Sequence, residues 1–112
     1  MMVPVRIRQD IVCSIPEIAY VYGQEVRRYL PAVPRSGDFV ELAPGWSSAV
    51  VDYTTFCADP DEPADVKLRT IKTDNPETIE EHQQLVDEHG WRWNTPPPDP
   101  DYVASVRRRK ER

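Results

Sequence analysis

Residues 3–15 read VPVRIRQDIVCSI, and the alternation in this stretch decides the fold class of the 112-residue chain. Apolar side chains share one parity, namely Val3, Val5, Ile7, Ile11, Cys13 and Ile15, and polar ones mostly occupy the other. A period of two is typical of a strand with one buried and one solvated face. Gln9 interrupts the apolar parity, so we expect a bulge or a strand edge there. The stretch predicts a long β-strand that ends at Pro16.

The next segment, residues 17–33, fits two periodicities. A strand accounts for Tyr20, Tyr22, Val26 and Leu30, with Gln24 and Arg28 as exceptions. A helix would instead align Ile18, Tyr22, Val26 and Tyr29. The aromatic and β-branched content, together with the flanking prolines, favours a strand over about 20–30. We expect it to form a hairpin with residues 3–15.

Twelve prolines and four glycines punctuate the rest of the chain. Proline and glycine form turns at 34–38 and 43–45, because one presets a turn dihedral and the other accepts positive φ. Between and after these turns, alternation predicts strands over 39–42, 46–57 and 66–71. The segment 59–65 is an acidic loop broken by two prolines.

A helix is predicted over about 76–89. Asp74 or Asn75 can cap it, Pro76 suits the first helical position, and Gly90 suits the C-terminal stop. Its inward face comprises Ile79, His82, Leu85, Val86 and His89. Trp91 to Trp93 can add a short last strand.

The chain divides into a domain and a tail. We expect residues 1–94 to form a single β-rich domain of the α+β class. Its sheet would be a small, strongly bent antiparallel sheet or a partly open barrel, with the C-terminal amphipathic helix packed on it. Residues 95–112 are proline-rich and then basic, and we expect a flexible tail.

Residues 34–42, PRSGDFVEL, resemble a segment of small SH3-like β-barrels: a proline–glycine turn, an Asp and a short apolar-alternating strand. The resemblance covers about nine residues and implies an SH3-like, partly open barrel. It names no activity, since such barrels serve as binding modules, nucleic-acid readers and structural subunits. A terminal helix is not part of a minimal barrel of this kind.

Motifs for catalysis or metal binding are incomplete. Gly45-Trp46-Ser47 begins a hydrolase elbow but lacks its last glycine and its helix. His82 and His89 are seven residues apart, about 10 Å along a helix, which is too far to share one zinc ion. The acidic loop lacks the glycine of a calcium loop, and Asp52 alone in a strand makes no acid–base pair. We therefore expect no enzyme activity, cofactor or metal.

Cys13 and Cys57 have two interpretations. They are either reduced, buried thiols on strands or one disulfide of an exported protein. The N-terminus has no apolar leader pattern and no stretch suits a membrane span, which favours the first interpretation. We expect a cytoplasmic protein without membrane contact.

Two groups of residues are candidates for partner contacts. Aromatic rings left at a surface favour protein interfaces, and acidic loops favour basic partners. The protein-contact candidates are Trp46, Trp91, Trp93, Asp59, Asp61 and Glu62. The nucleic-acid candidates are Arg107, Arg108, Arg109 and Lys110, at the end of a chain whose first 95 residues carry net charge −7.

The leading functional hypothesis is a non-enzymatic protein–protein interaction or assembly module, such as a phage-type or bacterial structural or accessory protein. A homo-oligomer belongs to this class. One alternative is an acidic inhibitor or immunity-type protein that binds a basic target, since the chain has net charge −5. A second alternative is nucleic-acid contact through the basic tail, which the acidic body disfavours.

Overall fold

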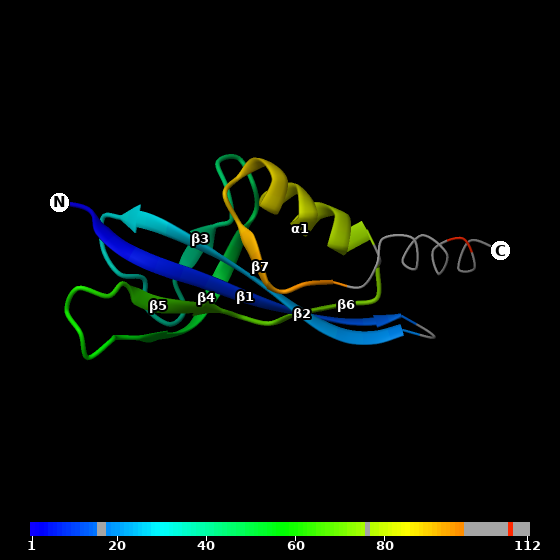
Figure 1. The fold of residues 1–112 in the computed structure, drawn as a ribbon, viewed down its shortest axis with the longest axis horizontal. Coiled ribbons are helices and arrows are strands. Elements are labelled where there is room, and N and C mark those ends of the chain that lie inside the picture. Colours follow the sequence, from blue (N-terminus) through cyan, green and yellow to red (C-terminus); the bar gives the residue numbers. More distant parts are fainter. Residues whose placement is uncertain (16–17, 76, 98–107, 109–112) are drawn as a thin grey trace.

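A computed structural model describes residues 1–15, 18–75, 77–97 and 108 (Figure 1). Two strands of 13 residues dominate it, β1 (Val3–Ile15) and β2 (Ile18–Leu30). They pair antiparallel in one register throughout. The predicted first strand, second strand and hairpin are confirmed, and the helix alternative for 17–33 is wrong.

The remaining strands are shorter. They are β3 (Phe39–Glu41), β4 (Ser48–Thr55), β5 (Ala64–Leu68), β6 (Ile71–Thr73) and β7 (Arg92–Thr95). The strands predicted at 39–42 and 46–57 exist with shorter bounds, and the last strand begins after Trp91. The strand predicted at 66–71 is two strands, β5 and β6, separated by Arg69 and Thr70; the Arg69 N–H still donates to the Val50 carbonyl of β4 at 2.9 Å.

The sheet is mixed and open. Its order is β3-β4-β5-β1-β2-β7, with β6 beside β1. Strands β5 and β6 both run parallel to β1, one after the other. The expectation of an antiparallel sheet is therefore wrong at its centre, because β3 and β4 return the chain to the end where β1 starts (Figure 1). The main-chain ladder does not close into a barrel.

One helix, α1 (Glu77–Glu88), packs on one face of this sheet (Figure 1). Asn75 caps it, since its Oδ1 accepts from the Glu77 N–H at 3.0 Å. Gly90 ends it with φ of +77°, and the Trp91 N–H donates to the Leu85 carbonyl at 3.4 Å. This bond spans one residue more than the 6→1 bond of a Schellman cap, and it closes the helix end around the positive-φ glycine. The predicted helix and its C-terminal stop are confirmed, and Pro76 lies outside the described residues.

The core between helix and sheet has two apolar clusters. The larger lies at the open end of the hairpin and includes Val5, Ile7, Val26, Leu85 and Trp91. The smaller comprises Ile11, Cys13, Tyr22 and Ile79. Gln9 and Gln24, both fully buried, separate the two clusters.

Gln9 and Gln24 are directly opposite on β1 and β2. The Gln24 Nε2 donates to the Gln9 Oε1 at 3.3 Å. No bulge occurs at Gln9 in the β1–β2 ladder, where the two interruptions of the apolar pattern meet each other. On its other side β1 pairs with β5 up to Arg8 and with β6 from Ile11, so the expected edge exists there as a local gap in the pairing.

The tail predicted over 95–112 lies mostly outside the described residues, which include only 95–97 and Arg108 of it. In the described part of the chain, no helix is long and apolar enough to cross a bilayer.

Candidate interaction groove

The two ends of the curved sheet approach each other where β3 lies near the end of β2. Arg28 bridges them: its Nη1 donates to the Glu41 carbonyl at 3.2 Å and its Nη2 donates to the Leu42 carbonyl at 2.6 Å. In a closed barrel, main-chain hydrogen bonds would join β2 to β3. Here the side chain of Arg28 makes the hydrogen bonds between them. We call this boundary between β2 and β3 the seam.

Trp91 completes the seam from the helix side. Its ring is 2% exposed, and its Nε1 donates to the Leu42 carbonyl at 2.8 Å. The Arg28 guanidinium carbon lies 5.8 Å from the centroid of that ring, within cation–π range. Burial lowers the pKa of Arg28, and the two carbonyl dipoles solvate the charge that the guanidinium retains. Because the turn at Gly90 and the bond from the Trp91 N–H to the Leu85 carbonyl fix Trp91, the end of helix α1 sets the position of the seam.

An apolar groove of about 330 Å³ opens at the seam. Its walls are the end of β2, the segment that follows it, strand β3 and the turn after β3. The lining residues are Arg28, Leu30, Pro31, Ala32, Pro34, Phe39, Val40, Glu41 and Pro44. Three prolines make these walls stiff, since each has a fixed φ.

Phe39 is the most exposed aromatic side chain of the groove, at 72%. The turn before it holds it in place. Gly37 has φ of +92°, and the Asp38 carboxylate accepts from the Arg35 N–H at 2.8 Å. The Thr54 hydroxyl on β4 donates to the Pro34 carbonyl at 2.6 Å. Phe39 is thus an exposed ring on a strand whose backbone is already fixed, so less conformational entropy is lost when it contacts a partner.

The main chain of β3 also offers an edge. Asp38 and Leu42 exchange hydrogen bonds with β4, through Val51 N–H to Asp38 carbonyl at 2.8 Å and Leu42 N–H to Ser47 carbonyl at 3.4 Å. In an antiparallel ladder alternate residues bond to the same neighbour, so the N–H and C=O groups of Phe39 and Glu41 point away from β4. The Glu41 carbonyl already accepts a hydrogen bond from Arg28. The Phe39 main chain remains at the open edge beside its own ring.

The three tryptophans expected at a contact surface point inward. Trp91 is in the core, and its hydrogen bond to Leu42 explains why: the indole N–H has its partner inside. Trp93 is half-buried with its Nε1 donating to Gln83 at 3.2 Å, and its ring lies edge-on to Tyr22 at 5.4 Å. Trp46 is half-buried against His89 at 5.8 Å between centroids. None of the three tryptophans is among the residues that line the groove.

The charged candidates fall in other places. Asp59, Asp61 and Glu62 form an exposed turn before β5, in which the Asp59 carboxylate accepts from the Asp61 N–H at 2.9 Å. This turn lies outside the groove lining. Of the basic tail, Arg108 is exposed, whereas Arg107, Arg109 and Lys110 lie outside the described residues.

Within the described residues no group of three His, Cys, Asp or Glu side chains could hold a metal ion. His82 is buried on the sheet-facing side of α1, whereas His89, just after the helix, packs edge-on against Trp46. Cys13 is buried in β1 and Cys57 is exposed after β4, so only one of the two expected buried thiols is confirmed. Asp52 is exposed at an irregularity of the β4–β5 ladder.

The sequence did not identify Phe39 and Arg28 as site residues. Arg28 gave a signal, because it stands at an inward parity of the second strand, where the pattern calls for an apolar side chain. A buried-parity arginine implies a specific acceptor, but the acceptors, the Glu41 and Leu42 carbonyls, are 13 and 14 residues away. Comparisons with protein-family models, with curated proteins and with solved structures found no match.

Proposed function

We propose that the protein is a non-enzymatic protein-interaction module that binds an extended peptide segment in the groove at the seam. One observation carries the proposal: an exposed aromatic ring, Phe39, stands beside an outward-facing main-chain edge and an apolar, proline-walled groove. Edge addition of a peptide strand uses main-chain hydrogen bonds for affinity and pockets for alternate side chains for selectivity. The seam offers both parts together.

The chemistry of the groove defines the partner segment. Its main chain would exchange hydrogen bonds with Phe39, whose N–H and C=O point away from β4. An apolar side chain of the segment would lie among the prolines and Leu30. Since Arg28 already donates to two carbonyls, it serves to hold the edge rather than to attract a charge. The preferred segment is therefore extended and apolar at alternate positions.

The test is a selection of linear peptides from a random library displayed on phage, with the wild-type chain as bait. Peptides that are enriched would then be titrated into the isotope-labelled chain and into Phe39→Asp. We expect the amide signals of residues 39–41 to shift on binding, and the aspartate variant to lose at least about 10-fold in affinity, as hot-spot aromatics do.

Phe56→Asp is the matched control, because Phe56 is also 72% exposed but does not line the groove. Both substitutions are at exposed sites, so both variants should keep wild-type stability to within about 0.5 kcal/mol. Enriched peptides that bind both variants equally well, or that shift no signal near Phe39, would overturn the proposal.

A further inference from the structure

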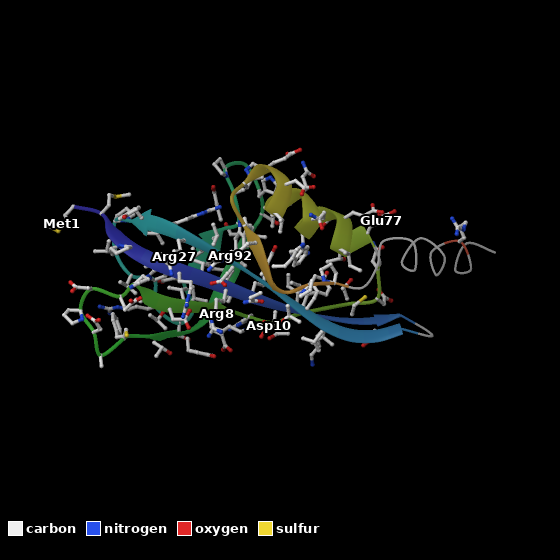
Figure 2. All side chains as sticks on the ribbon, in the orientation of Figure 1. Met1, Arg8, Asp10, Arg27, Glu77 and Arg92 are labelled. Atoms are coloured by element: carbon white, nitrogen blue, oxygen red, sulfur yellow. The ribbon has the colours of Figure 1, made fainter. Side chains whose placement is uncertain are left out.

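The face of the sheet opposite helix α1 is rich in cations although the chain as a whole has net charge −5. We call it the outer sheet face. Its charged residues come from β1, β2, β5, β6 and β7, at positions that alternate with inward-facing ones; Arg8, Asp10, Arg27 and Arg92 are labelled in Figure 2. By strand register its cations include Arg6, Arg8, Arg27, Lys67, Lys72 and Arg92, of which Lys67 is buried, and its carboxylates include Asp10, Glu25 and Asp65.

The three carboxylates are already engaged by cations of the same face. Asp65 lies 2.8 Å from Arg8 and 3.4 Å from Arg6. Glu25 lies 3.4 Å from Arg92, and Asp10 lies 3.6 Å from Lys67. Arg27 is exposed and has no ion-pair partner among the described residues. On this face the cations therefore outnumber the carboxylates, and Arg27 and the 66% exposed Arg92 side chain are open to solvent.

Helix α1 has the opposite charge on the other side of the molecule. Its sequence, ETIEEHQQLVDE, contains five carboxylates and no Lys or Arg. Asp87 and Glu88 lie in the last turn, where the negative end of the helix dipole disfavours them. Within the described residues they receive only the side-chain amides of Gln83 and Gln84, at 2.9 and 3.1 Å. A cation supplied from outside the chain would relieve this repulsion.

We propose that the outer sheet face binds the acidic helix surface of a second copy of this chain, so that copies stack head to tail. Charge complementarity carries the inference, since one protomer carries both surfaces. The spacing also matches: charges recur about every 5.4 Å along a helix, and neighbouring strands lie about 4.8 Å apart. Interleaved carboxylates make the face a poorer match for a uniform row of phosphates.

The arrangement has a consequence for symmetry. The two surfaces lie on opposite sides of the molecule, so the contact is heterologous, and it extends into a stack or ring rather than closing as a two-fold dimer. One helix of 12 residues covers a small area, and small interfaces are weak. The stacking is expected at chain concentrations of roughly 0.1–1 mM and at low salt.

Sedimentation velocity over a concentration series provides the test, at about 0.05 M and about 0.5 M NaCl. We expect the average mass to rise with concentration at low salt and to return to the monomer at high salt. Two charge variants separate the surfaces. Arg27→Glu with Arg92→Gln removes the cationic side, and Asp87→Lys with Glu88→Lys removes the acidic side. The helix variant should fold at least as well as wild type, because lysine suits a helix C-terminus.

Mixing the two variants gives the deciding result. Each variant alone should remain monomeric, and an equimolar mixture should form a dimer and nothing larger, because one intact surface of each kind remains in the pair. A wild-type chain that stays monomeric throughout, or a mixture that does not associate, would overturn the proposal. So would a monomeric chain whose outer face binds only added poly-glutamate. Phe39→Asp should stack as wild type does, so failure of the peptide groove and failure of stacking are distinguishable.

Discussion

At the scale of single residues, the buried polar side chains of Gln9 and Gln24 separate the two apolar clusters of the core. Gln9 and Gln24 pair with each other, while the Gln9 Nε2 and the Gln24 Oε1 have no hydrogen-bond partner among the described residues. A buried polar group costs free energy unless it is paired, and removing one partner costs more than removing both. The pair is therefore expected to behave as a coupled unit.

A double-mutant cycle tests this coupling. Gln9→Leu and Gln24→Leu should each lower the free energy of unfolding by about 1–3 kcal/mol, because each leaves the other amide buried without its partner. The double variant should lose less than the sum of the two and come close to wild type. Urea denaturation measures all four proteins. Additive losses would show that the glutamines act independently.

Arg28 is the second residue whose role is specific. Arg28→Met keeps an unbranched apolar stem over Trp91 but removes both hydrogen bonds to the β3 carbonyls. We expect a loss of about 2 kcal/mol in the free energy of unfolding, as for hydrogen bonds made by a charged donor. Arg27→Met, at the exposed neighbouring position, should change it by less than about 0.5 kcal/mol. Equal effects of the two substitutions would contradict the seam as described.

At the scale of elements, the local patterns predicted the hairpin and the helix because their determinants are close in sequence. The Asn75 cap and the Gly90 stop lie within a residue or two of the helix they bound. The parallel pairing of β5 with β1 could not be read locally, since it joins Arg6 to Asp65, 59 residues apart. The seam likewise depends on Trp91 meeting Leu42, 49 residues away.

Helix α1 carries a pH-dependent contact with the sheet. His82 is buried, with its Nδ1 at 2.7 Å from the Thr78 carbonyl. Burial lowers its pKa below the usual 6.5, against the opposing effects of that carbonyl and of Glu81. The unfolded chain therefore binds more protons than the folded chain once the pH falls below about 6.5, so stability falls over that window.

The measurement is the free energy of unfolding between about pH 7.5 and pH 5 for wild type and for His82→Gln. We expect wild type to lose stability toward the acid side, and the difference between the two proteins to shrink, because glutamine has no proton to gain. Parallel curves for the two proteins would show that His82 does not contribute to the acid response. At pH 7.5, His82→Gln should be less stable than wild type, because it lacks the imidazole ring that packs edge-on to Tyr22 at 6.2 Å between centroids.

At the scale of the whole molecule, the two apolar clusters differ in size and share one helix. The larger spans strands β1 to β5, the last turns of helix α1 and Trp91 just before β7, whereas the smaller has four buried members near the hairpin tip. Regions with fewer buried contacts open more readily than the rest. Gln9 and Gln24 lie between the two clusters and interrupt the apolar packing from one to the other. We therefore expect the two clusters to open separately. We call this pair the glutamine layer.

Native-state hydrogen exchange should therefore resolve two levels of protection. Amides of β1 and β2 around Ile7 and Val26 should open only with global unfolding, and those around Ile11 and Tyr22 should open at a free energy lower by at least about 1 kcal/mol. Ile79→Ala should lower protection at the hairpin tip with a smaller effect on the larger cluster, while Leu85→Ala should lower both, because Leu85 is in the larger cluster. Uniform protection along the hairpin in wild type would show that the molecule opens as one unit and that the glutamine layer does not divide it.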